Sequence, residues 1–253
     1  KILAMWKFIH KLSSPPYFFD FAKRIIPWLL IIGILQLIIG VISGLFFAPA
    51  DYQQGDAFRI IYVHVPAAYL SIMIYTIMAA ASFVGLIWRI KLAHTVSISA
   101  APVGAWLTFL ALLTGSIWGR PMWGTWWEWG DPRLTSELIM FFLYIGFIAL
   151  HSSVDDLKKA DRAGAILILV GAINVPIIHF SVEWWSSLHQ GPTLFRADGP
   201  SIDPSMLYPL VLMILGFCFY FCALILIRIR GEILYRQQNT NWVRNLIARE
   251  NYE

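Results

Sequence analysis

Six stretches of the chain are apolar almost without interruption, and polar residues gather in the segments between them. The stretches cover about residues 27–47, 65–88, 95–118, 134–150, 163–180 and 206–227. A helix needs roughly 20 apolar residues to cross the hydrocarbon core of a bilayer. The pattern therefore predicts an all-α integral membrane protein with six transmembrane helices, folded as a single polytopic domain over residues 1–253.

The basic residues divide unequally once six spans are threaded through a membrane. One side receives the N-terminus, the 89–94 and 151–162 loops and the C-terminal tail, and it carries 15 of the 19 Lys and Arg residues. These are Lys1, Lys7, Lys11, Lys23, Arg24, Arg89, Lys91, Lys158, Lys159, Arg162, Arg228, Arg230, Arg236, Arg244 and Arg249. The other side carries Arg59, Arg120, Arg133 and Arg196. Because cytoplasmic loops are enriched in Lys and Arg, the split places both termini in the cytoplasm.

Composition agrees with this assignment. Hydrophobic residues make up 58% of the 253 residues and charged residues only 13%, about half of the roughly 25% usual in soluble domains. The net charge of +4 comes from the cytoplasmic loops, since the outer loops hold four basic residues against eight acidic ones. No nucleic-acid partner is therefore implied.

Several function classes find no support in the sequence. No span has a charged residue near its middle, where ion-coupled transporters and proton pumps usually place one. Gln36 and Asn174 are the main polar side chains at depth, and we expect them to form hydrogen bonds between helices. There is no P-loop motif. Cys218 and Cys222 do not form a C-x-x-C pair, and we expect them to pack against neighbouring helices.

The predicted outer loop 119–133 has an unusual tryptophan content. Five tryptophans fall within the twelve residues 118–129, and two more occur at 184 and 185 in the next outer loop. An interfacial aromatic belt explains one or two tryptophans at each span end, but not five in one loop. We interpret the loop as an apolar platform for a planar, hydrophobic dianion, with Arg120 and Arg133 as candidate partners for its carboxylates. Haem is the obvious candidate, although both arginines could instead snorkel to the interface or pair with acidic residues of the loop, namely Glu128, Asp131 or Glu137.

Residues 123–129, with the sequence WGTWWEW, and Asp131 with residues 133–137, RLTSE, resemble the tryptophan-rich "WWD" signature of haem-handling proteins. Within that group the chain is similar to the cytochrome c maturation protein C (haem exporter protein C) family. Residues 47–55, 62–68, 178–185 and 188–191 also match, so the resemblance covers nearly the whole chain. One residue departs from the pattern: Gly130 separates Trp129 from Asp131, which leaves the orientation of Asp131 open.

The resemblance implies a site for non-covalent, transiently bound b-type haem. His64 and His189, both predicted to lie near the outer face, would be the axial ligands of the haem iron, the alternative being purely structural histidines. The platform would comprise Trp118, Trp123, Trp126, Trp127, Trp129 and Asp131. Arg133, inside the matched motif, is favoured over Arg120 for the propionates. Trp184, Trp185 and His179 would support the site without binding iron.

The resemblance also implies a function and partners. The chain would be a multi-pass protein of the bacterial inner membrane that delivers haem to a membrane-anchored periplasmic haem chaperone. It would work with a small single-span accessory protein and the subunits of an ATP-binding cassette (ABC) transporter, and would not itself be an enzyme with catalytic residues. The alternatives are a permease that exports haem or another hydrophobic anion, and a scaffold subunit that binds no chromophore.

Overall fold

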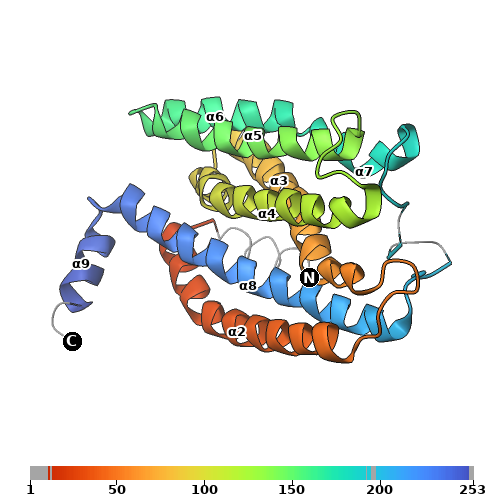
Figure 1. Ribbon diagram of the computed structural model, residues 1–253. Coiled ribbons are helices and arrows are strands. Elements are labelled where there is room, and N and C mark those ends of the chain that lie inside the picture. Colours follow the sequence, from red (N-terminus) through yellow and green to blue (C-terminus); the bar gives the residue numbers. More distant parts are fainter. Residues whose placement is uncertain (1–10, 12, 192, 195–197, 251–253) are drawn as a thin grey trace.

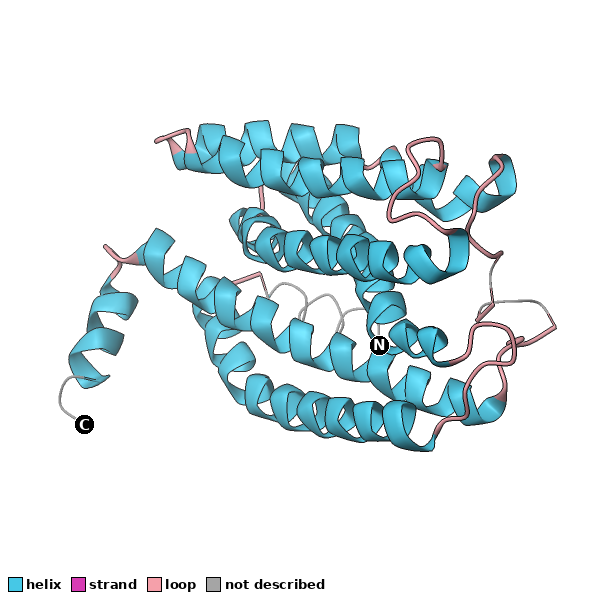
Figure 2. Ribbon diagram, in the orientation of Figure 1, coloured by secondary structure: helices cyan, strands magenta, loops and turns pink. Residues whose placement is uncertain are grey.

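The computed structural model describes residues 11, 13–191, 193–194 and 198–250, and the named elements within these ranges are helical (Figure 1, Figure 2). They are α2 (Pro15–Ile42), the π-helical turn η1 (Ser43–Phe47), the 3-10 turn η2 (Asp56–Ile60), α3 (Ile61–Trp88), α4 (Lys91–Trp123), α5 (Pro132–Ser152), α6 (Leu157–Gly171), α7 (Asn174–Trp184), α8 (Pro204–Gln237) and α9 (Asn241–Glu250). The described residues contain six segments long and apolar enough to cross a membrane: Pro15–Phe47, Asp56–Trp88, Lys91–Trp123, Pro132–Ser152, Leu157–Trp184 and Pro204–Gln237. The predicted all-α fold with six spans is confirmed.

The helices are longer than the apolar stretches that predict them. Helix α2 begins at Pro15 rather than near residue 27, and α8 continues to Gln237, ten residues past the predicted end. An apolar stretch reports the thickness of the hydrocarbon core, whereas backbone hydrogen bonds can continue a helix beyond it into polar surroundings. The described tail after residue 227 is thus helical to Gln237, and the short amphipathic helix α9 follows after a turn. The Trp242 ring of α9 packs edge-on against the Phe19 ring, with centroids 5.8 Å apart.

The fifth span is not one continuous helix. Helix α6 ends at Gly171 and α7 starts at Asn174. The buried Asn174 side chain donates from Nδ2 to the carbonyl of Ser136 on α5, at 2.8 Å, which confirms the predicted hydrogen bond between helices. The corresponding prediction for Gln36 is not met at its side-chain oxygen, which is buried and has no hydrogen-bond partner among the residues that the structure describes.

Close helix packing orders the bundle. Helix α2 runs along α8, and a Cβ added at Gly33 would lie only 2.8 Å from the backbone nitrogen of Tyr220. Helices α3 and α4 pack as an antiparallel pair. Tyr75 of α3 and Tyr144 of α5 are fully buried, and their rings meet edge to face with centroids 5.2 Å apart. Much of α2 is exposed and aliphatic, as expected for a lipid-facing helix.

The connections separate into two groups at opposite ends of the bundle (Figure 1). The loops at residues 48–55 and 124–131 and the described residues 185–191 and 198–203 lie at one end, which we call the tryptophan end. The connections at 89–90 and 153–156, the start of α2 and the end of α8 meet at the other, which we call the terminal end. This grouping is the one that the sorting of basic residues predicted. Lys1, Lys7 and Arg196, which entered that sorting, lie outside the described residues.

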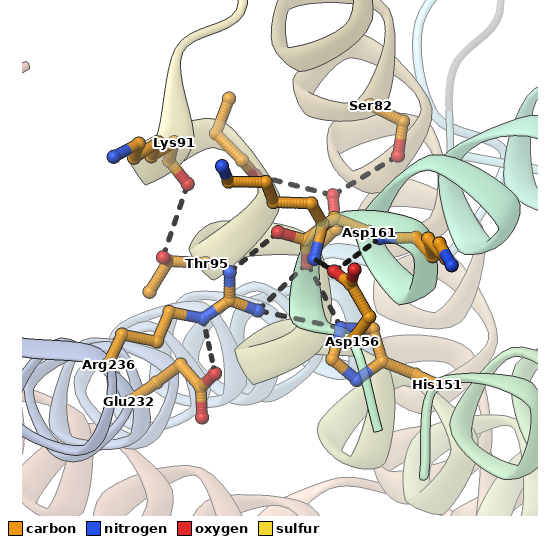
Figure 3. A network of polar contacts seen from close by, with 12 residues as sticks. Ser82, Lys91, Thr95, His151, Asp156, Asp161, Glu232 and Arg236 are labelled. Atoms are coloured by element: carbon orange, nitrogen blue, oxygen red, sulfur yellow. Dashed lines mark hydrogen bonds and ion pairs between the residues drawn. The ribbon is translucent and has the colours of Figure 1, made fainter. Parts of the chain in front are cut away.

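Figure 3 shows a polar network at the terminal end, which we call the terminal junction (His151, Asp161, Glu232 and Arg236). The Arg236 guanidinium on α8 donates to both carboxylate oxygens of Asp161 on α6, at 2.7 and 2.8 Å, and to Glu232 at 2.5 Å. The Nε2 atom of His151, on α5, lies 3.0 Å from the same Asp161 carboxylate. The terminal junction therefore ties α5, α6 and α8 together at the end of the bundle opposite the tryptophans.

Candidate functional site

The tryptophan loop is shorter than the predicted 119–133 segment. Helix α4 continues through Pro121 to Trp123, and α5 begins at Pro132, so residues 124–131 form the loop itself. Proline removes only one backbone hydrogen bond near the helix end, and the α4 helix stops at Gly124, which has a φ of 77°. Trp123 is consequently held on the last turn of α4 instead of on a loop, on the same helix as Trp118.

The tryptophans fall into two sets. Trp118 and Trp123 are partly buried, and the Trp118 indole donates to Gln54 Oε1 at 2.9 Å. Trp126 and Trp129 are exposed, by 57% and 74%. Trp127 is also partly buried; its ring lies 5.5 Å from that of Trp129, and its indole nitrogen is buried with no hydrogen-bond partner among the described residues.

His64 is fixed through one of its two ring nitrogens. It lies in the first turn of α3, where its Nδ1 atom is 3.1 Å from the carbonyl oxygen of Ala111 on α4 and 3.1 Å from Thr114 Oγ1. A carbonyl oxygen only accepts hydrogen bonds, so this contact places the proton on Nδ1. The Nε2 atom then carries a free lone pair, and it has no hydrogen-bond partner among the described residues.

His189 is held in a similar way, but from a loop. Its Nδ1 atom lies 3.5 Å from Asp131 Oδ1 and 3.4 Å from Ser187 Oγ. A carboxylate also only accepts, so the geometry again favours the proton on Nδ1 and the lone pair on Nε2. No described residue bonds to the Nε2 atom of His189.

Both histidines pack against tryptophans at the end of α4. The Trp118 ring packs edge-on against the His64 ring at 5.7 Å, and the Trp123 ring packs against the His189 ring at 4.9 Å. These two tryptophans are five residues apart on one helix, about 7.5 Å along its axis. The histidines are also close enough to influence each other electrostatically.

Asp131 connects the tryptophan loop to the loop of His189. Its Oδ1 atom accepts from the backbone N–H groups of Arg133 and Leu134, both at 3.0 Å, and so caps the start of α5. Its Oδ2 atom accepts from Ser187 Oγ at 2.7 Å and from the Leu188 N–H at 2.8 Å. The side chain is only 1% exposed. The inserted Gly130 therefore leaves Asp131 turned inward, toward the last outer loop.

These contacts keep the Asp131 carboxylate ionised. Burial by itself would raise its pKa, but the bonds from His189, Leu134, Ser187 and Leu188 outweigh burial and hold the pKa well below the ordinary value of 3.8. The stabilisation from this group is complete above that ordinary value and is lost as the pH falls from there through the lowered pKa. At neutral pH the carboxylate is an acceptor for every donor around it.

The two candidate arginines differ in their surroundings. Arg120 donates to the carbonyl of Gly124 and so stabilises the end of its own helix. The Arg133 guanidinium has no hydrogen bond or ion pair with any described residue. It is partly buried and lies within electrostatic range of His64, Tyr69 and Glu137. Glu137 is buried and accepts from Ser71 Oγ at 2.8 Å.

The three residues predicted to support the site, His179, Trp184 and Trp185, are exposed. His179 is exposed on α7, its ring 4.7 Å from that of Phe180, which stacks on Trp184 at 5.2 Å. Within the described part of the chain no contact joins His179 to His64 or His189. Trp184 and Trp185 are about half exposed.

Sequence reasoning did not find Ser187, Thr114 or the Ala111 carbonyl. A serine in an irregular loop and a backbone carbonyl in an apolar helix carry no pattern that sets them apart. The capping role of Asp131 did have a signal, because an Asp followed by Pro is a frequent helix start.

Two free imidazole nitrogens define what the site can bind. They are fewer than the three or four protein ligands of a typical zinc site. They are the number that a metal already held in a planar macrocycle needs for its two axial positions. The surrounding indoles and the free Arg133 guanidinium fit a ligand with an apolar face and an anionic edge.

Comparison with known proteins gives a consistent result. Residues 8–244 match the family model described as "Heme exporter protein C". The chain is 51% identical over 245 residues to the heme exporter protein C of Escherichia coli strain K12, covering 97% of this chain and 98% of that protein. It is 47% identical over 242 residues to the Haemophilus influenzae protein of the same name, covering 96% and 98% of the two chains. The Paracoccus denitrificans protein of that name is 40% identical over 250 residues, covering 98% and 99%.

Proposed function

Because the chain belongs to the heme exporter protein C family, we propose that it binds haem non-covalently between His64 and His189 and presents it to a partner protein. The single observation that carries this proposal is that the two histidine rings are held through the same nitrogen. Each is oriented through Nδ1, and each keeps its Nε2 atom free of hydrogen bonds with described residues. Two such nitrogens near one helix end suit the axial positions of a b-type haem.

The remaining residues have separate tasks in this proposal. Trp118 and Trp123 hold the two imidazoles in place and exclude water beside them. The Arg133 guanidinium would pair with a propionate, while Arg120 is already committed to the Gly124 carbonyl. The Trp127 indole N–H is buried with no partner in the described part of the chain, and would be a second donor available to an anionic edge.

The same proposal assigns a side of the membrane. The basic residues at the terminal end favour a cytoplasmic position for that end and for both termini. The tryptophan end then faces the periplasm of a bacterial inner membrane. Haem bound there is accessible to a periplasmic protein without crossing this chain.

We propose that the partner is a membrane-anchored periplasmic haem chaperone. Trp126 and Trp129 are exposed on the loop that Asp131 links to His189, and they would offer an aromatic surface to this partner. A small single-span protein and ABC transporter subunits would complete the assembly. The chain would position haem rather than catalyse bond formation, and moderate affinity would allow haem to leave.

The first test is the absorption and electron paramagnetic resonance spectrum of the detergent-purified protein with haem. We expect the low-spin signature of two imidazole ligands, since both Nε2 atoms are free to bind iron. His179→Ala provides a matched control and should leave the spectrum unchanged, because His179 is exposed and apart from the site. A high-spin spectrum in the wild type, or loss of the signal in His179→Ala, would contradict the assignment. Haem accumulation outside vesicles that contain this chain alone would favour a permease.

The second test concerns the exposed aromatic surface. Replacing Trp126 and Trp129 by alanine should lower co-purification with the haem-loaded chaperone by about tenfold or more, because exposed tryptophans often dominate interface affinity. The haem spectrum and the thermal midpoint should change little. Trp28→Ala is the control, since Trp28 is 66% exposed on the surface of α2. Equal complex yields from the double variant and the control would argue against this surface.

A further inference from the structure

We infer that Asp131 is the positioning residue for His189: it holds the imidazole so that Nε2 faces the iron, and does not contact haem itself. The inference rests on the proposed function and goes beyond it, because it assigns a separate task to an acidic residue within the tryptophan platform. Three observations support it: the partners of the two Asp131 carboxylate oxygens, the hydrogen bonds through Ser187 to His189, and the difference between Asp131 and the aspartates that cap α6 and α8.

The hydrogen bonds to backbone N–H groups reach different parts of the chain from the two carboxylate oxygens. Oδ1 caps α5 through the N–H groups of Arg133 and Leu134. Oδ2 accepts from Ser187 and Leu188, more than fifty residues away in the sequence. One buried side chain thus fixes the loop of His189 relative to α5.

Ser187 extends this link to His189. Its hydroxyl donates to Asp131 Oδ2 and accepts from the backbone N–H of His189 at 3.1 Å. The His189 ring then faces Asp131 Oδ1 across 3.5 Å. Asp131 therefore acts on His189 along two routes, through the backbone of residues 187–189 and directly toward Nδ1. A carboxylate partner at Nδ1 sets the tautomer of a metal-binding histidine and raises the basicity of its other nitrogen.

Capping alone does not explain this arrangement. Asp156 caps α6 by accepting from the N–H groups of Lys158 and Lys159, at 2.8 and 3.2 Å, and is exposed. Asp203 caps α8 by accepting from the N–H and hydroxyl of Ser205 and is also exposed. Of these three caps, Asp131 is the buried one whose second oxygen bonds to a distant loop.

The test compares Asp131→Ser with Asp156→Ser in the full-length protein. Serine remains a good N-cap, so each variant keeps the start of its helix. The shorter serine hydroxyl at position 131 cannot also serve Ser187 and Leu188. We expect Asp131→Ser to bind haem about 10–100-fold more weakly and to lose the low-spin signal. Added imidazole should restore that signal, because the iron position vacated by His189 is otherwise intact. Asp156→Ser should match the wild type.

A haem-free measurement tests the same inference independently. Nitrogen-15 chemical shifts of His189 should show the Nδ1–H tautomer in the wild type and a mixture of tautomers in Asp131→Ser. Wild-type tautomer, spectrum and haem affinity in Asp131→Ser would overturn the inference and leave Asp131 as a helix cap alone. If the wild type shows the expected tautomer but no two-imidazole haem signal, the proposed function fails, and the positioning of an iron ligand fails with it. A two-imidazole signal in the wild type that survives unchanged in Asp131→Ser rejects only the positioning role.

Discussion

Replacing His64 by alanine is expected to abolish the two-imidazole haem signal and to lower the haem retained through purification by at least about tenfold. Loss of a residue that only supports a ligating histidine already costs about 10–100-fold in metal affinity, so loss of the ligand should cost at least as much. His64 is held between α3 and α4 by a backbone carbonyl. The Trp118 ring packs edge-on against it, with the ring centroids 5.7 Å apart.

His189→Ala should also abolish the signal, but the two variants should respond differently to added imidazole. The His189 side chain is 18% exposed and comes from a loop, so imidazole can reach the vacated position from solvent. His64 is packed against Gly115, where an added Cβ would lie 3.0 Å from the imidazole ring. We therefore expect rescue at lower imidazole concentrations for His189→Ala. Unchanged two-imidazole spectra in both alanine variants would refute the ligand assignment.

Removing the Arg236 side chain is expected to have the largest effect on stability. Arg236→Ala leaves Asp161 and Glu232 as uncompensated carboxylates at the terminal junction, where the Arg236 and Asp161 side chains are only 13% and 12% exposed. Breaking a buried ion pair by removing one partner typically costs about 3–5 kcal/mol in the free energy of unfolding. Because Arg236 joins α8 to α6, the loss should appear as reduced resistance to heat or denaturant in detergent.

The exposed pair between Arg59 and Asp56 provides a control for this experiment. Asp56 is 78% exposed, and Asp56→Asn should change the free energy of unfolding by less than about 1 kcal/mol. The folded fraction of Arg236→Ala should keep the wild-type haem spectrum, because the terminal junction (Figure 3) lies at the end of the bundle opposite the start of α3 and the tryptophan loop (Figure 1). A stability equal to that of Asp56→Asn would show that the terminal junction is not an important link between helices.

The limits of the sequence-based predictions are clearest at the tryptophan loop. The sequence marked His64, His189 and Asp131 as candidates, mainly through the family resemblance. It did not show that Asp131 and Ser187 meet, because fifty-six residues separate them and neither lies in a periodic element. It also placed residues 119–123 in a loop, since the apolar stretch ends near residue 118, whereas the backbone remains helical to Trp123.

By itself the sequence determined the six spans, their alternation and the unequal distribution of basic residues between two sides. These properties are local: a bilayer core requires about 20 apolar residues, and a helix satisfies its own backbone hydrogen bonds. Only the tertiary structure decided which nitrogen of each histidine, and which of the two arginines, has no hydrogen-bond partner among the described residues. A side chain's hydrogen bonds depend on groups brought near it by packing, such as the Ala111 carbonyl for His64 and the Asp131 carboxylate for His189.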